Sequence, residues 1–204
     1  MPNWCDNTVE VVGDKEVLET ILEKAKDENQ PFSFQKLVPQ PEGLSETRHS
    51  GKKNSAKDEA EWANALAGNR KYVYTDWYNW RLGNWGTKWD LDFDTTQISK
   101  IVPTTDGKQS KFEIGYSTAW APALQFWQTL SEQYPIKVKN LYAEEGVGFL
   151  GRAFIENGEV DDECLDITPE IYKSLGVPLD EDGCVDWENA DEYDLYDYFK
   201  EGEN

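Results

Sequence analysis

The sequence predicts an α+β fold in which two helices cover one face of an antiparallel sheet. Two stretches, residues 14–26 and 122–134, repeat apolar residues at helical spacing. Segments that alternate apolar and polar residues lie before, between and after them, as the strands of a half-buried sheet do. The order is strand, helix, a long insertion, two strands, helix and two strands. Without the insertion, this is the split βαβ plan of ferredoxin-like domains.

The first strand and the first helix have clear local signals. Residues 8–12, with the sequence TVEVV, are typical of a strand, and Gly13 ends it. Asp14 is a good N-cap for a helix that runs to the polar segment DENQP. We expect the insertion to occupy about residues 27–86, with a polar loop and a further helix at residues 55–68.

The later elements follow from alternation and from turn residues. Pro122 suits the first turn of the second helix, and Asn157-Gly158 is a strong hairpin signal. In the segment TKWDLDF, we expect Trp89 to lie on a buried strand face, so that its replacement by alanine would leave a cavity. The strands are expected at residues 87–93, 111–118, 136–142 and 147–155.

Charge divides the chain into two parts. Residues 156–204 hold 18 acidic residues and two basic ones, a net charge of −16 out of the total of −20. We therefore expect a ferredoxin-like domain at residues 1–160 and an acidic C-terminal extension at residues 161–204. The extension contains Trp187, Tyr193, Tyr196 and Phe199, which are unlike a disordered acidic tail. We expect it to pack on the body, with a short helix after Thr168-Pro169.

Cysteine usage and the N-terminus suggest a cytoplasmic protein. The three cysteines form no C-x-x-C pair, which is typical of a reduced protein without a disulfide framework. The first residues show no signal peptide. No apolar run approaches the roughly 20 residues that a membrane-spanning helix needs.

Six segments carry a family resemblance: MPNWCDNTVEVVG, FSFQKLVPQPEGL, DWYNWRLGNWGTKWD, STAWAP, LSEQYP and YAEEGVGFLGRAFIENGEV. In this order, over about residues 2–160, they resemble the YubB-type ferredoxin-like domain family of plasmid, phage and genomic-island proteins. The resemblance implies an accessory protein of a mobile element and supplies no catalytic residue. Ala123 departs from it, because a second proline is expected there. The motif residues to which it assigns a structural role are Asn3, Trp4, Cys5, Gly86, Trp89 and Trp120.

The residues give little support to a catalytic or metal site. His49 is the only histidine, which excludes a histidine triad or a multi-histidine metal site within one chain. Cys5 is more simply a small buried residue than a nucleophile. Asp90, Asp92 and Asp94 alternate and could bind a divalent cation, although a solvated strand face is the simpler interpretation. No phosphate-binding glycine pattern occurs. We expect no cofactor and no metal.

The tryptophans have two interpretations. Trp77, Trp80 and Trp85 lie in a polar, glycine-containing segment and are candidates for a recognition surface, with a place in the core as the alternative. Trp127 fits the apolar face of the second helix, and we expect it to be buried.

Two functional hypotheses remain open. The first is a non-enzymatic inhibitor whose acidic surface mimics nucleic acid. It would bind the basic surface of a host defence nucleoprotein or nuclease, and charge complementarity would speed and orient the encounter. Solubility is the alternative explanation of the charge. The second is an enzyme that acts on a small molecule or nucleotide through carboxylates. The net charge opposes direct binding to nucleic acid. The candidate partner-binding residues are Asp180, Glu181, Asp182, Asp186, Glu188, Asp191, Glu192, Asp194 and Asp197.

Overall fold

The computed structural model describes residues 3–28, 30–42, 44, 76–186, 188 and 192–199. The helix expected at residues 55–68 lies outside the described residues, as do His49, Trp187 and Asp191.

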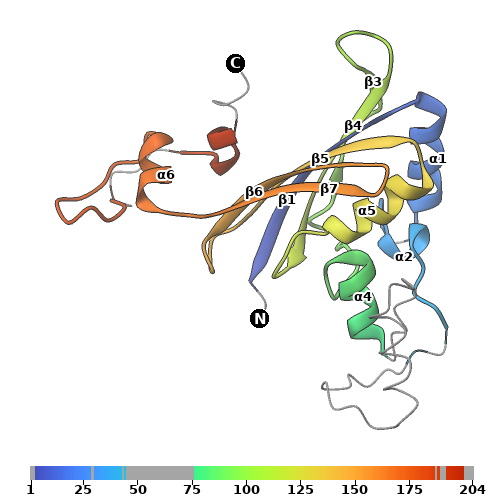
Figure 1. Ribbon diagram of the computed structural model, residues 1–204, viewed down its shortest axis with the longest axis horizontal. Helices are drawn as coiled ribbons and strands as arrows, with labels where there is room; N and C mark the ends of the chain where they lie inside the picture. The colour runs from blue at the N-terminus through green and yellow to red at the C-terminus, as the bar shows by residue number, and fades with distance from the viewer. Residues whose placement is uncertain are drawn as a thin grey trace.

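The strands of the described residues form one antiparallel sheet of seven strands in the order β2-β4-β1-β5-β6-β7, with β3 also paired to β4 (Figure 1). The central strand β1 pairs with β4 on one side and β5 on the other. β4 and β5 are therefore parallel to each other, with β1 between them. The strands are β1 Trp4–Gly13, β2 Gln97–Ile98, β3 Val102–Pro103, β4 Ser110–Ala119, β5 Ile136–Glu144, β6 Phe149–Glu156 and β7 Glu159–Asp166.

One face of this sheet is covered by helices. The two predicted helices are confirmed as α1 (Lys15–Ala25) and α5 (Leu124–Gln133), and α5 connects β4 to β5 in a split βαβ unit. Two shorter helices, α2 (Phe34–Leu37) and α4 (Trp77–Trp85), complete the layer. The α+β, ferredoxin-like fold class is confirmed. The residues that the layer and the sheet bury together include Val9, Val11, Leu18, Ile21, Phe112, Ile114, Phe126 and Leu130.

Aromatic side chains fill the centre of this layer. Trp127 is fully buried, as predicted, and its ring centroid lies 5.0 Å from that of Phe126 and 5.9 Å from that of Phe32. Its indole N–H donates to the hydroxyl of Tyr116 over 2.7 Å. Trp85 is also fully buried and donates its N–H to the carbonyl oxygen of Val38 over 2.9 Å. Both indoles thus bury their rings and satisfy their only polar group.

The expected strand at residues 87–93 is wrong. Helix α4 ends at Gly86, whose φ of 82° lies in the left-handed region, and residues 87–96 then follow an irregular path. Leu91 is buried, but Trp89 is 40% exposed and Phe93 is 62% exposed. The aspartates explain the difference, because their carboxylates accept backbone hydrogen bonds that compete with strand pairing.

The C-terminal residues extend the sheet and partly cover its other face. The hairpin at Asn157-Gly158 is confirmed, with φ of 53° and 78°, and β7 continues the sheet to Asp166. Beyond β7 come α6 (Pro169–Ser174) and a short 3-10 helix, η1 (Leu195–Phe199). Figure 1 shows α6 and the loop after it projecting past one end of the sheet, opposite to α1. A second apolar cluster joins Ala143 and Leu150 to Ile171, Tyr172, Val177, Leu195 and Phe199.

Candidate functional site

The acidic loop of the extension has a defined conformation. Leu179 and Val185 pair as an isolated antiparallel bridge. Between them, the carboxylate of Asp180 accepts hydrogen bonds from the backbone N–H of Asp182 (3.0 Å) and of Cys184 (2.8 Å). Asp180 therefore shapes the turn, as aspartate does in Asx turns, and the loop holds Asp182 exposed.

Most of the candidate acids face solvent, as far as the structure describes them. Asp186 is partly buried, whereas Asp197 is exposed, and Asp194 accepts a hydrogen bond from the backbone N–H of Tyr196 over 2.9 Å. With respect to the residues that the structure describes, the following acids are exposed and form no ion pair: Asp180, Glu181, Asp182, Glu188, Glu192 and Asp194.

Tyrosines fix the extension to the turn between β5 and β6 and to β1. The carboxylate of Glu145 accepts from the hydroxyl of Tyr193 over 3.1 Å. Burial and this carboxylate raise the pKa of Tyr193, so the phenol stays protonated and donates. The hydroxyl of Tyr196 donates to the backbone oxygen of Asp6 over 3.0 Å. The described acids near Asp180 and Asp194 therefore lie in segments held by defined contacts.

The candidate recognition surface at Trp77, Trp80 and Trp85 is wrong for two of its members. Trp80 and Trp85 are buried in the main core, where their rings meet edge to face at 5.7 Å. Trp77 is partly exposed, and the guanidinium of Arg81 lies between it and Trp85, at 5.2 Å and 4.8 Å from the two ring centroids. Trp80 and Trp85 are five residues apart, which is not the spacing of one helix face, so the sequence pattern does not mark the two as buried neighbours.

Three other tryptophans form an exposed cluster, which we call the tryptophan cage: Trp4, Trp89 and Trp120. They are 48%, 40% and 45% exposed, respectively. The ring centroids of Trp4 and Trp89 are 6.0 Å apart. The ammonium group of Lys88 lies 3.6 Å from the ring centroid of Trp89 and 3.7 Å from that of Trp120. The cage thus brings together the motifs MPNWC, NWGTKWD and STAWAP, which are far apart in the sequence.

Close backbone contacts build the cage. A Cβ atom on Gly86 would lie 2.8 Å from the carbonyl oxygen of Pro122, so only glycine allows the segment of Trp89 this close to the turn before α5. Trp120 has a φ of 69°, and its backbone N–H donates to the carbonyl oxygen of Asn3 over 3.0 Å. The motif residues to which the sequence assigned a structural role therefore lie together at one end of the sheet.

Because Trp89 is 40% exposed, its replacement by alanine should lower the free energy of unfolding by only about 1 kcal/mol, well below the loss from a core cavity. Urea denaturation of the variant measures this, with Trp85→Ala as the buried control. A loss of about 3 kcal/mol or more for Trp89→Ala, the size of a core cavity, would contradict the exposed position.

Cys5 and Asp90, two of the residues considered for catalysis or metal binding, have structural positions in the described part of the chain. Cys5 is fully buried, and burial raises the pKa of its thiol, with Asp6 and Glu144 adding to the effect. Asp90, Asp92 and Asp94 do not share a strand face; instead, the Asp90 carboxylate binds the start of α2. Within the described ranges, no group of three or more histidine, cysteine, aspartate or glutamate side chains is placed to hold a metal ion.

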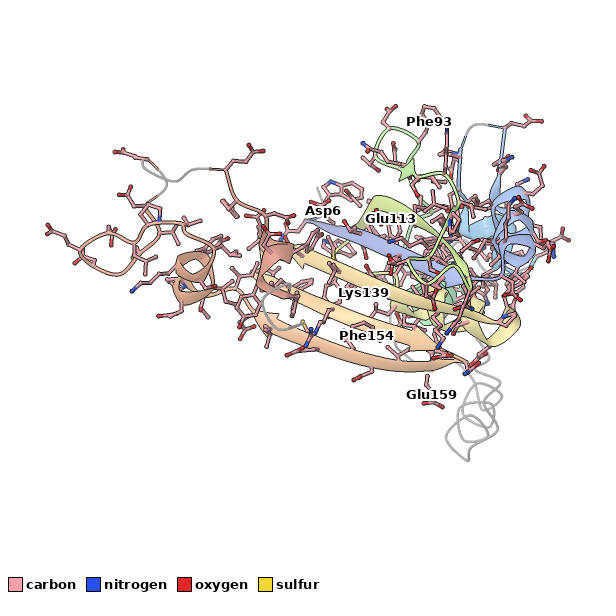
Figure 2. All side chains as sticks on the ribbon, turned by 90° about the horizontal axis from the view of Figure 1, so that it is seen from above. Asp6, Phe93, Glu113, Lys139, Phe154 and Glu159 are labelled. Carbon is pink, nitrogen blue, oxygen red and sulfur yellow. The ribbon has the colours of Figure 1, made fainter. Side chains whose placement is uncertain are left out.

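The open face of the sheet carries a shallow groove of about 640 Å³ beside Lys139 and Phe154. Figure 2 labels both residues there, with Glu159 at the margin. Its charged side chains include an ion pair between Lys137 and Glu156 at 3.3 Å, and no tryptophan lines it.

In the part of the chain that the structure describes, no helix has the length and apolar character needed to cross a membrane.

Fold and sequence together define a protein with a ferredoxin-like α+β domain. Residues 84–173, just under half of the chain, match the family model described as the ferredoxin-like domain in Api92-like protein. A crystal structure of a protein api92 from Yersinia pseudotuberculosis is similar to this chain, with 10% sequence identity, 82% of this chain and 99% of that chain covered, and a TM-score of 0.44. No curated protein matches the sequence.

Proposed function

We propose that this chain is a non-enzymatic inhibitor that binds a host protein through its acidic C-terminal extension. The target surface is a basic, nucleic-acid-binding one on a nucleoprotein or nuclease, and the extension occupies it in place of nucleic acid. The observation that carries the proposal is the ordered, projecting loop whose exposed acids form no ion pair with the described residues.

Order in the extension favours a binding role over a purely solubilising one. A flexible acidic tail gives solubility without any fixed arrangement of charge. Here Asp180 and the Leu179–Val185 bridge hold the loop, and Tyr193 and Tyr196 hold the segment that follows. A surface that is already ordered loses less conformational entropy on binding. Its negative field speeds and orients the encounter with a positive partner.

The biological setting is part of the same proposal. The motifs that resemble the YubB-type family support a plasmid or phage origin, and a cytoplasmic host target fits an inhibitor that acts where it is made. Direct binding to nucleic acid is opposed by a net charge of −20. A carboxylate-based enzyme has less support, because the carboxylates of Glu10, Glu156 and Glu163 on the open face pair with lysine or arginine side chains.

Removing charge from the extension should slow the association with the partner. The variant carries Glu181→Gln, Asp182→Asn, Glu188→Gln and Glu192→Gln, and keeps Asp180, whose side chain shapes the turn. We expect the association rate constant to fall by about tenfold at low salt, with little change in the dissociation rate constant. The partner is first captured from host lysate and identified by mass spectrometry, and stopped-flow kinetics then compare the two proteins over a range of salt concentrations.

A matched control removes four charges from the other end of the molecule. Glu16, Glu19, Glu23 and Glu28 lie exposed on or just after α1, away from the extension. Their replacement by glutamine changes the net charge equally and should leave association nearly as fast as in the wild type. An equal loss of rate in both variants would show that total charge alone matters. An unchanged rate with no salt dependence would reduce the extension to a solubility function.

A further inference from the structure

The geometry points to a second contact with the partner: the tryptophan cage is a binding site for an arginine side chain, and Lys88 occupies it in the free protein. The identity of the occupant as a residue of a basic partner rests on the proposed function. The cation-binding character of the cage rests on its own geometry, and a free arginine derivative tests it without any partner.

Lys88 shows that the cage accepts a cation. Its ammonium group lies within 4 Å of the ring centroids of both Trp89 and Trp120. A cation within about 6 Å of an indole face is attracted by the negative charge on that face. Two faces at this distance make a cation site of the aromatic-cage type, and Trp4 lies beside it, against Trp89.

The backbone of Trp120 indicates that the site is maintained against strain. A φ of 69° is rare for a bulky residue and is a strained backbone conformation. Burial does not compensate for this strain, because the indole remains 45% exposed. Backbone strain that holds a large aromatic ring at the surface is typical of a binding site. Three exposed tryptophans in one patch are likewise more than single scattered surface residues.

Arginine is the cation that fits best. Its guanidinium is planar and more weakly hydrated than an ammonium group, so it stacks on aromatic rings and loses less hydration on entering the cage. It can therefore displace Lys88, whose ammonium moves back into water at little cost. The protein's net charge of −20 also attracts a cation to this surface.

The cage lies at the end of the sheet from which the extension projects. Trp4 precedes Asp6 on β1 by two residues, and Tyr196 of the extension binds the backbone oxygen of Asp6. Asn3, which binds the backbone of Trp120, also reaches the carboxylate of Glu144 over 3.5 Å, one residue before the Glu145 that holds Tyr193. One partner surface can therefore meet the acidic extension and the cage together.

The test is a titration of the full chain with N-acetyl-arginine amide, followed through the indole N–H signals in ¹⁵N-resolved NMR spectra. We expect saturable shifts of the Trp89 and Trp120 signals. Lys88→Met removes the competing ammonium and should tighten binding by about three- to tenfold. Lys139→Met is the matched control, because it removes a lysine that lies 5.7 Å from the ring centroid of Phe154 on the open face. It should leave the affinity unchanged.

A second variant removes the cage while preserving the backbone. In Trp120→Gly the left-handed conformation becomes free of strain, so the fold should be kept. The shift of the Trp89 signal on adding the arginine derivative should be lost. If this variant unfolds, Trp89→Ala removes the other ring at an exposed position and gives the same readout at Trp120.

Two results would overturn the cage. One is an affinity in Lys88→Met no tighter than in Lys139→Met. The other is the absence of a saturable shift with the arginine derivative; a saturable shift with adenosine in its place would then make the cage a stacking surface for nucleobases. The two proposals can fail separately. An association rate that does not depend on salt would contradict only the role of the extension, whereas the absence of shifts with the arginine derivative would contradict only the cage.

Discussion

Replacing Trp127 by alanine should lower the free energy of unfolding by about 3–5 kcal/mol, the loss typical of deleting a fully buried tryptophan. The indole lies at the centre of the helical layer, in ring contact with Phe32 and Phe126. Its removal opens a cavity between α5 and the sheet. It also takes away the N–H that binds the hydroxyl of Tyr116, which is itself buried.

Urea denaturation followed by far-UV circular dichroism measures the change. Trp127→Phe serves as the control, because it keeps one aromatic ring in the site while removing the N–H and part of the indole, and it should lose clearly less stability. A loss below about 1 kcal/mol for Trp127→Ala would place the residue outside the core and overturn the packing described for α5.

Asp90→Ala should be the second large loss, about 3 kcal/mol, because a charged acceptor with several hydrogen bonds disappears at once. Its carboxylate accepts from the hydroxyl of Ser33 (2.6 Å) and from the backbone N–H of Phe34 (2.7 Å). It also accepts from the N–H of Gln35 (3.2 Å) and of Leu91 (2.8 Å). Asp90 thus caps the N-terminus of α2 from a segment that lies 55 residues or more away in the sequence.

Asp94→Ala is the matched control, since Asp94 is exposed and lies four residues further along the same segment. Thermal and urea unfolding should leave it within about 0.5 kcal/mol of the wild type. Equal losses in the two variants would show that the segment responds to charge in general and that the cap at α2 is unimportant.

The elements with strong local periodicity were predictable from the sequence. The stretches at residues 14–26 and 122–134 contain α1 and α5, because a helix on a sheet needs an apolar stripe that the sequence shows directly. The segment at residues 87–93 shows the opposite case. Its apolar and acidic residues alternate as in a strand, but the carboxylates accept hydrogen bonds from backbone N–H groups, one of them on α2. The local sequence pattern does not show a contact with a segment so far away in the chain.

Only the acidic part of the candidate site could be predicted from the sequence. The acidic residues are clustered in the sequence itself, and this clustering identified the extension. The cage was not predicted, because the exposure of Trp4, Trp89 and Trp120 depends on three segments that meet only in the fold. The sequence did show each of these tryptophans in a short motif with small or polar neighbours. That signal singled out the residues but did not predict that they form a binding site.

The last strand of the sheet has a consequence for how the chain behaves at high concentration. β7 pairs with β6 on one side and is the outermost strand in the described sheet order. A free edge of eight residues offers backbone groups to which a second copy could add a strand. Asp161, Asp162 and Glu163 lie consecutively along it and repel an identical edge. Negative charge along this strand therefore protects the protein from edge-to-edge aggregation, at an edge separate from the acidic loop proposed to meet the partner.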